Sequence, residues 1–316
     1  MILPTLLNKM KTQKVFIVVL NWNGFGDTLE CLKSLDKLQI TNYKLQIVVV
    51  DNNSSDGSVE KLRKLNFSQF ELEILENNEN LGFAEGNNVG MDWAIEHGAD
   101  WVMILNNDTI VDRDLVVSLM KVAKKEKKVG ILSPKIYFSK GFEFHKKRYQ
   151  KSELGGVIWY AGGEMDWNNV YGRNRGVDEV DNGQYDEVSE IDFATGACMM
   201  ISTKALKVVG GLDRRYFMYL EDVDLSLRMK KKGWQVLFVP DARLWHKVAQ
   251  SSGIGSDLND YYLTRNRIGF ALKYAPLRAK VAVIREAIKL LYMGREWQKK
   301  GAWDFALGKM GKGSYK

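Results

Sequence analysis

The stretch WVMILNND, residues 101–108, joins five apolar residues to two asparagines and an aspartate. Its apolar part, Trp101–Leu105, predicts a buried strand. In open α/β sheets, ligands bind outside the carboxyl ends of the strands, and carboxylate oxygen is the ligand that a hard cation prefers. Asparagine and aspartate also favour ordinary turns. This stretch alone therefore leaves a turn and a binding site open.

Strands and helices alternate on the N-terminal side of this stretch. Apolar runs at Val15–Leu20, Gln46–Val50 and Leu72–Leu75 predict three strands. A helix is predicted after each run: one with a capping-box-like start at Asp27 and Glu30 and leucines continuing to Leu38, one with Val59, Leu62 and Leu65, and one from about Ala84 to Glu96. This alternation predicts an α/β fold with an open, mostly parallel, Rossmann-like sheet flanked by helices.

The pattern continues on the C-terminal side. The predicted elements are a helix that starts at Asp112 or Asp114, a strand over Val129–Phe138, ordered structure over 193–202, a helix over Leu220–Lys231 and a strand over Trp234–Val239. Residues 139–190 show no strong period and predict an inserted loop and strand region. We expect one main domain over residues 1–256.

The net charge of +7 is concentrated at the C-terminal end. Residues 257–316 hold 13 Lys and Arg against 5 Asp and Glu, which leaves 33 against 34 for residues 1–256. The body is therefore close to neutral, and no stripe of basic and aromatic residues crosses it. This distribution argues against a nucleic-acid binder and predicts a basic helical appendage over 257–316.

Cysteine content and hydropathy bear on the compartment. Cys31 and Cys198 are the two cysteines, and their spacing fits neither a CxxC motif nor a metal site. No apolar run approaches the roughly 18 residues that a spanning helix needs. The apolar stretch Ile2–Leu7 is short and lacks a small-residue cleavage site after it. We therefore expect a cytoplasmic protein with buried thiols.

Polar residues follow three of the predicted strands, at Asn21–Asn23, Asp51–Asp56 and Asn106–Asp108. Because parallel strands share one carboxyl edge, we expect these groups to converge. A fourth segment, Gly82–Asn88, places glycines and amides at a helix start, where free N–H groups suit anions. Neither GxGxxG after the first strand nor GxxxxGK[ST] occurs, which disfavours a dinucleotide oxidoreductase or a P-loop NTPase.

Three carboxylates, Glu221, Asp222 and Asp224, lie within four residues at a predicted helix start. Neighbouring carboxylates repel one another, which raises a pKa and makes one of them a candidate general base. Acidic residues at a helix start also stabilise the helix dipole, and both roles can occur here in different residues. Among the three histidines, His97 is predicted to cap a helix and His145 to lie on the surface, whereas His246 has an apolar flank suited to a metal ligand.

The ordered motifs resemble the family 2 glycosyltransferases with the GT-A fold, closest to the rhamnosyltransferase-like branch. The resemblance covers roughly residues 14–270. It implies a catalytic domain over residues 1–256, with a donor half of about 14–138 and an acceptor half of about 139–256. The segments that carry it are 15–24, 48–58, Asn80-Leu81-Gly82-Phe83, Asn106-Asn107-Asp108, Ala194-Thr195-Gly196-Ala197, Glu221-Asp222 and Trp245-His246.

This resemblance implies a role for each matching residue. Asp51 would contact the base or ribose of a nucleotide-sugar donor, and Asn21, Asn53, Gly82, Asn87, Asn106 and Asn107 would complete the donor site. Asp108 and His246 would hold Mg²⁺ or Mn²⁺ on the donor diphosphate. Asp222 would be the catalytic base, and Thr195, Gly196 and Glu221 would face the acceptor. Asn106 departs from the aspartate that is usual at the first position of the family's DxD motif.

The implied reaction is the inverting transfer of a sugar to a saccharide or lipid-linked saccharide in polysaccharide biosynthesis at the cell envelope. A dTDP-rhamnose-like donor is the leading candidate, and a UDP-hexose is next. A sugar nucleotidyltransferase on a similar sheet is the alternative, but Asn21-Trp22-Asn23-Gly24 lacks the Lys or Arg of a basic phosphate loop.

The last part of the chain contains an amphipathic basic helix. Leu277, Val281, Ile284, Ile288 and Leu291 recur at helical spacing, with Arg278, Lys280, Arg285 and Lys289 at the other positions. This apolar stripe could dock on the catalytic domain. Alternatively, residues 271–316 could attach peripherally to the anionic inner face of the cell membrane, with Trp297 and Trp303 as interfacial anchors.

Overall fold

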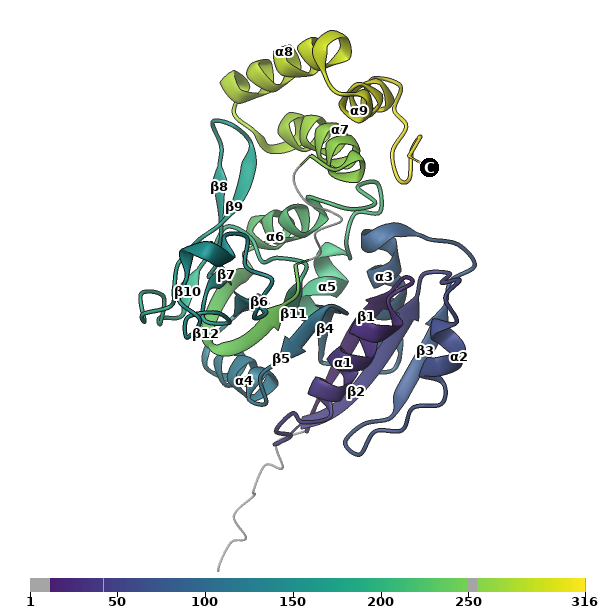
Figure 1. Ribbon diagram of the computed structural model, residues 1–316, viewed down its shortest axis with the longest axis vertical. Helices are drawn as coiled ribbons and strands as arrows, with labels where there is room; N and C mark the ends of the chain where they lie inside the picture. The colour runs from purple at the N-terminus through teal and green to yellow at the C-terminus, as the bar shows by residue number, and fades with distance from the viewer. Residues whose placement is uncertain (1–11, 42, 249–254, 316) are drawn as a thin grey trace, which may run out of the picture.

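A mixed sheet runs through the middle of the molecule, with helices packed on both of its faces (Figure 1). The computed structural model describes residues 12–41, 43–248 and 255–315. The predicted short apolar stretch Ile2–Leu7 lies outside these residues. The described residues form a 10-stranded sheet in which the main strand order is β10-β12-β6-β11-β4-β1-β2-β3.

The N-terminal half of the sheet is parallel. Its strands are β1 (Gln13–Asn21), β2 (Tyr43–Asp51), β3 (Leu72–Glu76) and β4 (Trp101–Asn106). The helices between them are α1 (Phe25–Leu35), α2 (Ser58–Leu62) and α3 (Gly82–Glu96). The register pairs Asn21 with Asp51 and Leu20 with Asn106. The polar strand ends therefore meet at one edge, and the predicted fold class is confirmed.

Continuous apolar runs explain why these strands are central. Val15–Val19 and Ile47–Val50 are buried without alternation, as expected where helices cover both faces of a parallel sheet. Two glycines let α3 approach β1 closely. A Cβ at Gly90 would lie 2.4 Å from Val18, and one at Gly86 would lie 2.6 Å from Leu20.

The second half of the sheet adds antiparallel pairs. β11 (Cys198–Ser202) lies antiparallel between β4 and β6 (Val129–Phe138), and β12 (Gln235–His246) runs parallel to β6. The remaining described elements of this half are β5 (Thr109–Val111), α4 (Leu115–Lys125), η1 (Lys146–Arg148), β7 (Ile158–Tyr160), β8 (Gly163–Asp166), β9 (Tyr171–Asn174), β10 (Ser189–Glu190), α5 (Thr203–Val209) and α6 (Glu221–Lys231).

Two local predictions differ from the structure. Asp27 and Glu30 do not cap α1, which begins after Gly24 without a side-chain cap; both carboxylates accept instead from Lys247 Nζ. The strand predicted over Trp234–Val239 continues to His246, through an irregularity between Val239 and Arg243. The sequence predicted neither β5 nor α5.

Three helices form the C-terminal end: α7 (Asp257–Tyr274), α8 (Leu277–Met293) and α9 (Glu296–Ala306). In Figure 1 they stack above α6 and the hairpin of β8 and β9. The side chains of Tyr261, Arg265 and Asn266 in α7 are fully buried. Within the described residues, no helix is long and apolar enough to cross a membrane.

Both cysteines are free and buried. Burial raises the pKa of the Cys31 thiol to about 12, and the pKa of Cys198 is also raised by burial. At neutral pH they remain protonated core thiols.

Candidate active site

Hydrogen bonds join the carboxyl ends of β1, β2 and β4. Asn21 Nδ2 donates to Asp51 Oδ2 at 2.7 Å, while its Oδ1 accepts from Thr28 at 2.7 Å. Asn107 Nδ2 donates to the same threonine hydroxyl at 2.9 Å. Asn21 is fully buried, so its amide holds Asp51 in place. We use the name donor edge for Asn21, Thr28, Asp51, Asn53, Asn106, Asn107 and Asp108, together with His246 beside Asp108.

A pocket of about 410 Å³ opens beside Asp51. Its lining includes Asn53 and Ser54 from the turn after β2 and Asn77 from the end of β3. Asn53 is exposed and takes a left-handed φ of 63°, which asparagine tolerates better than most residues. Ser54 N–H donates to Asp51 Oδ1 at 2.8 Å. The turn after β2 thus places polar groups around a pocket that the Asp51 carboxylate also lines.

The buried Asn52, which the sequence analysis did not select, holds the neighbouring turn. Its Nδ2 donates to Gly82 O at 3.0 Å, and its Oδ1 accepts from Asn77 and from Leu81 N–H. Asn87 is also buried and donates to Phe83 O at 2.9 Å, within α3. These amides are used in local bonds that fix the start of α3.

Asp108 and His246 lie together although 138 residues separate them in the sequence. Pairing of β5 with β12 aligns Thr109 with His246 and explains this proximity. Asp108 Oδ1 is 3.0 Å from His246 Nε2, and Asp108 O accepts from Lys247 N–H at 2.9 Å. Trp159 packs edge-on against the imidazole, with ring centroids 4.7 Å apart. The imidazole is therefore held beside the carboxylate on an apolar wall.

This pair fits a divalent cation. Asp108 Oδ1, which faces His246 Nε2, and the other ring nitrogen, His246 Nδ1, are both buried without an assigned hydrogen-bond partner. Burial would raise the pKa of Asp108, but His246 and then Lys247 outweigh it, so the pKa is lowered and the carboxylate stays charged. Over residues 12–41, 43–248 and 255–315, no third His, Cys, Asp or Glu joins them.

A second group of residues, here called the acceptor edge, centres on Asp222. Its Oδ2 accepts from Gly196 N–H at 2.9 Å, and its Oδ1 accepts from Val223 N–H at 2.8 Å. Ser226 links α6 to the 194–197 loop, since its hydroxyl donates to Asp222 O and accepts from Ala194 N–H. Thr195 is mostly buried in this loop. The Asp222 carboxylate therefore has a fixed direction.

Glu221 and Asp222 form an electrostatically strained pair. Burial, followed by repulsion from Asp222, raises the pKa of Glu221 well above its usual range. Burial also raises the pKa of Asp222, although the N–H groups of Gly196 and Val223 oppose the rise. Glu221 Oε2 is buried without a hydrogen-bond partner. A proton is consequently held more tightly here than on an ordinary surface carboxyl, as general-base chemistry near neutral pH requires.

Asp224, the third carboxylate of the cluster, has a structural environment. Its Oδ2 accepts from Arg228 Nε at 2.6 Å, and its Oδ1 accepts from Lys273 and Tyr274 of α7. The side chain is fully buried and paired on both oxygens. Asp224 thus joins α6 to α7.

The loop that leads into α6 has an unusual backbone. Phe217, Tyr219 and Leu220 have φ values of 65°, 68° and 74°. Left-handed conformations cost residues other than glycine about 1–2 kcal/mol each, so surrounding contacts must stabilise this loop. Its path places Glu221 and Asp222 at the first turn of α6.

Two close contacts join the start of α3 to the loop before α6 and to the 194–197 loop. A Cβ at Gly82 would lie 2.5 Å from the ring of Phe217, and one at Gly196 would lie 2.9 Å from the ring of Phe83. Glycine is required at both positions because the aromatic rings occupy the space that a side chain would need. Phe217 O also accepts from Ala84 N–H at 3.0 Å. The start of α3 and the loop before α6 are thus packed as one unit.

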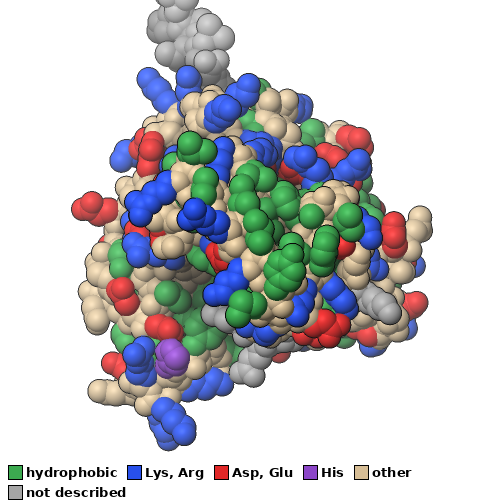
Figure 2. All heavy atoms as spheres, turned by 90° about the horizontal axis from the view of Figure 1, so that it is seen from above, with side chains coloured by type: hydrophobic (Ala, Val, Ile, Leu, Met, Phe, Trp, Pro, Cys, Tyr) green, Lys and Arg blue, Asp and Glu red, His purple; other side chains and the backbone are tan. Residues whose placement is uncertain are grey.

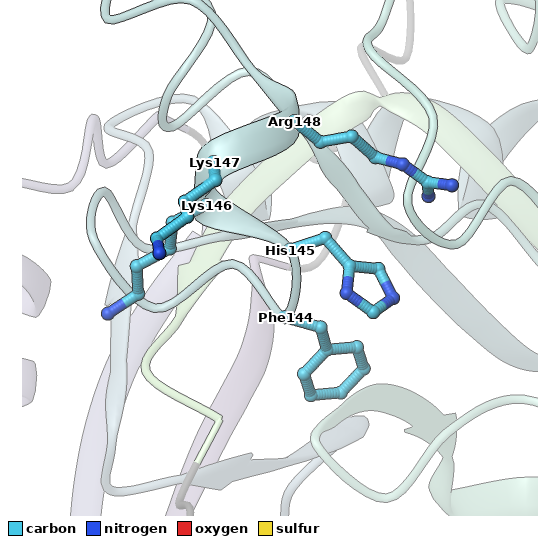
Figure 3. A pocket seen from close by; sticks show the side chains of 5 residues that line it. All are labelled: Phe144, His145, Lys146, Lys147 and Arg148. Atoms are coloured by element: carbon cyan, nitrogen blue, oxygen red, sulfur yellow. The ribbon is translucent and has the colours of Figure 1, made fainter.

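A separate hollow of about 620 Å³ is lined by Phe144, His145 and the three basic residues of η1 (Figure 3). All five residues come from one loop, and the side chains in Figure 3 do not converge on a common point. As predicted, His145 is on the surface. None of the predicted site residues lines this hollow.

A sheet that gathers carboxylates and amides at its strand ends is typical of nucleotide-binding α/β enzymes. The model of Glycosyltransferase like family 2 matches residues 13–266, so the chain belongs to the family 2 glycosyltransferases.

Curated relatives agree with this assignment. An N-acetylglucosaminyl-diphospho-decaprenol L-rhamnosyltransferase of Mycobacterium tuberculosis is 27% identical over 231 residues, covering 67% of this chain and 70% of the relative. A dTDP-rhamnosyl transferase of Shigella flexneri is 25% identical over 253 residues, covering 74% of each chain. The predicted resemblance to rhamnosyltransferases is confirmed at this modest identity.

The fold is also shared with solved glycosyltransferases. A mannosyltransferase from Pyrobaculum calidifontis, solved in complex with GDP-Man and Mn²⁺, superposes with a TM-score of 0.53 at 17% identity, covering 93% of this chain and 74% of that one. The fold is the GT-A fold, as predicted, and the protein is a glycosyltransferase.

The structure collects most of the predicted site residues at the two edges. It also adds Thr28, Asn52 and Lys247, which sequence reasoning missed. Asn52 lies inside the Asp-Asn-Asn turn that follows β2, so its position after a strand was an available signal. Lys247 directly follows His246, but nothing in the sequence indicated that it pairs with Asp27 and Glu30.

Proposed function

We propose that the protein is an inverting glycosyltransferase that moves a sugar from a nucleoside-diphosphate sugar to a hydroxyl of a saccharide or lipid-linked saccharide. One connection carries this proposal: Asn106 N–H, at the end of β4, donates to Ala197 O at 2.9 Å. Asp108 lies two residues after this bond, and Gly196, which holds Asp222, lies one residue before Ala197. The proposed site for the anionic donor and the candidate base are thus connected through a backbone hydrogen bond between β4 and the 194–197 loop.

On the donor edge, Asp51 and Asn53 would bind the base or ribose in the 410 Å³ pocket. Asn21 would hold Asp51, and Asn52 and Asn87 would fix the turn at Gly82. Asn106 and Asn107 would position the ribose and the sugar. Asp108 and His246 would hold Mg²⁺ or Mn²⁺, and that cation would offset the negative charge that develops on the leaving diphosphate.

On the acceptor edge, Asp222 would remove the proton from the attacking hydroxyl. The N–H groups of Gly196 and Val223 aim its carboxylate, and burial raises its pKa and hence its proton affinity. Thr195, Gly196 and Glu221 would contact the acceptor. The hydroxyl would attack the anomeric carbon on the face opposite the leaving diphosphate, and this single displacement inverts the configuration. General-base assistance of this kind contributes roughly 10²- to 10⁴-fold in rate.

A dTDP-rhamnose-like donor has the most support, because two relatives are named rhamnosyltransferases and one of these names specifies dTDP. A UDP-hexose is the next candidate. The relative from Mycobacterium tuberculosis is named for a diphospho-decaprenol acceptor, which supports a lipid-linked saccharide and a role in polysaccharide and cell-envelope biosynthesis.

A donor panel tests the proposal. Thermal stability would be measured with dTDP-rhamnose, UDP-glucose and GDP-mannose, each with Mn²⁺, Mg²⁺ or a chelator, and nucleoside diphosphate release would be followed with the same set. Because a ligand stabilises the state that it binds, the donor should give the largest shift, and only with a cation. Absence of any shift and of any nucleotide release across the panel would overturn the proposal.

Residues 257–316 have the surface expected of a peripheral membrane contact. In α8, Leu277, Val281, Ile284 and Ile288 are 77%, 43%, 41% and 53% exposed. A different face, which includes Ala279 and Val283, is buried against the neighbouring helices. Four of the five residues of the predicted stripe are thus exposed, whereas the fifth, Leu291, is partly buried against the core. In Figure 2, which looks down on this end, hydrophobic side chains gather in a patch with Lys and Arg around it.

We therefore propose that an anionic membrane surface binds this face of α8, with the protein on the cytoplasmic side. At about 100° per residue, Arg278, Arg285 and Lys289 fall along one flank of the exposed stripe. Apolar insertion with basic flanks is the usual pattern for binding anionic lipids. Trp303 is exposed and suits an anchor role, whereas Trp297 packs against Tyr261 and Tyr315.

Vesicle co-sedimentation would test this contact on the full chain. Ile284→Asp with Ile288→Asp should abolish pelleting with phosphatidylglycerol vesicles. The matched control, Val177→Asp with Val208→Asp, changes exposed valines elsewhere on the surface and should pellet like the wild type. Equal pelleting of all three proteins, or no pelleting of the wild type, would exclude the proposed membrane face.

A further inference from the structure

Two consecutive residues of α7, Arg265 and Asn266, are fully buried and polar. Asn266 Nδ2 lies 2.9 Å from Tyr216 O, 2.7 Å from Met218 O and 3.1 Å from Tyr219 O. Its two amide hydrogens are therefore shared among three carbonyls of one short loop. Its Oδ1 accepts from Arg265 Nε at 3.0 Å, and this fixes the orientation of the amide because arginine can only donate.

Arg265 reinforces the same loop from the other side. One of its terminal nitrogens donates to Tyr216 O at 2.9 Å, and the other donates to Gly311 O at 2.7 Å. The guanidinium also lies over the rings of Tyr261 and Tyr262, at 5.3 and 5.0 Å from their centroids. The segment after α9 therefore helps to hold the arginine that holds the loop.

The loop needs such support because its backbone is unfavourable. Phe217, Tyr219 and Leu220 are left-handed, and a turn with this shape relaxes when its carbonyls lose their partners. The bonds from Asn266 reach the residues on both sides of Phe217, whose ring fills the space above Gly82. Relaxation of the loop would move the first turn of α6, which carries Glu221 and Asp222.

We propose that Asn266, braced by Arg265, is a positioning residue for transfer: it holds the 216–220 loop in the shape that aims Asp222 at the acceptor. This inference rests on the proposed function, since it assumes that Asp222 is the base. It assigns residues of the C-terminal helices to the machinery of the reaction, through their bonds to the 216–220 loop. Toward the loop the asparagine acts by donating, so a carboxylate of the same size cannot replace it.

The sharpest test compares Asn266→Asp with Asn259→Asp. Both changes add one negative charge to α7 at nearly constant volume, but Asn259 makes no side-chain bond to the loop among the described contacts. Because a displacement of about 1 Å can reduce a rate roughly 10²-fold, Asn266→Asp should lower kcat by about that factor. The KM for the donor, and the thermal shift that nucleotide and Mn²⁺ cause, should stay within about 2-fold of the wild-type values. Asn259→Asp should match the wild type in all three.

Hydrogen exchange provides a second readout that does not depend on activity. In Asn266→Ala, backbone amides of residues 217–223 should exchange faster, while those of β1 and β4 keep their protection. If Asn266→Asp folds with wild-type kcat, or if its kcat falls only together with donor affinity, the positioning role is wrong. Unchanged exchange over 217–223 in Asn266→Ala would overturn it as well.

The two proposals fail separately. If the wild type releases no nucleoside diphosphate from any donor, the proposed function is wrong. The hydrogen-exchange result then still tests whether Asn266 holds the 216–220 loop. If the wild type is active and Asn266→Asp is equally active, only the positioning role falls.

Discussion

The donor edge and the acceptor edge are built in different ways. The donor edge consists mainly of strand ends within the first 108 residues that hydrogen-bond to one another, such as Asn21 to Asp51, and His246 of β12 joins it beside Asp108. The acceptor edge joins the 194–197 loop, the left-handed 216–220 loop and α6, and α7 holds it from outside. The strands of the sheet thus hold most residues of the candidate donor site. The Asp222 carboxylate, in contrast, is oriented only when segments far apart in the sequence have folded together.

From this difference we expect donor binding and transfer to respond to different substitutions. A change on the donor edge should remove the cation or the nucleotide, and with it every later step. A change on the acceptor edge should leave the donor bound and slow the transfer. The following variants would break or sharpen this distinction.

Asp222→Asn should have the largest effect. The amide keeps the shape of the side chain but cannot take a proton, so transfer should fall by roughly 10²- to 10⁴-fold. Product formation from the best donor and a hydroxyl acceptor measures this. Asp224→Asn is not a suitable control because Asp224 anchors α7, so Asp92→Asn, an exposed change on α3, serves instead. Undiminished turnover by Asp222→Asn would remove the assignment of the base.

Asp108→Ala should reduce transfer by roughly 10²-fold, the scale at which one preorganised electrostatic group contributes to a rate. The loss should be accompanied by weaker nucleotide binding and a changed response to Mn²⁺, because the Asp108 carboxylate is one of the two proposed ligands of the cation. Activity measured against Mn²⁺ concentration checks this, with Asp92→Ala as the control. A wild-type Mn²⁺ dependence in Asp108→Ala would contradict the metal role.

Gly196→Ala should lower kcat by roughly 10-fold. The new Cβ would lie 2.9 Å from the ring of Phe83, and the resulting shift displaces the N–H that aims Asp222, a misplacement of the kind that slows a reaction. Gly26→Ala is a matched control, since its Cβ would meet nothing within 4 Å. Steady-state kinetics of both variants provide the measurement, and equal kcat values would show that this loop tolerates displacement.

Glu221→Gln should have the smallest effect, on stability. Because the pKa of Glu221 is raised in the folded state, folding is favoured while the carboxyl is protonated, and this stabilisation is lost as pH rises through the folded pKa. Glutamine does not titrate, so the Tm of the variant relative to wild type should rise from pH 4 to pH 8. Calorimetric scans across that range test the sign. A Tm difference that is constant or falls with pH would show that Glu221 is not a buried, strained carboxyl.

The sequence predicted the donor edge better than the acceptor edge for a physical reason. Apolar runs that alternate with predicted helices along the chain identified β1, β2 and β4. Because parallel strands share a carboxyl edge, the proximity of Asn21 to Asp51 could be predicted. Joining Asp108 to His246 required the resemblance to a family, because the short β5 that aligns them carries little signal.

The support of the acceptor edge could not be predicted in this way. Neither the left-handed backbone at Phe217 nor the bonds from Asn266 to that loop follows from local pattern, since the two segments lie about 50 residues apart. The amphipathic pattern of α8 was predicted from spacing, but only the structure showed that most of the stripe is exposed, apart from Leu291, while a different face is buried. The division of the chain at residue 256 stays a prediction, and the bonds from Arg265 and Asn266 show that the two sides of that boundary are in contact.

Calorimetric titration of the preferred nucleoside diphosphate with Mn²⁺ tests the central claim most directly. If the two edges divide binding from turnover, Asp222→Asn should bind within about 2-fold of the wild type, while Asp108→Ala should bind at least roughly 10-fold more weakly. Loss of binding in Asp222→Asn together with wild-type binding in Asp108→Ala would contradict the account.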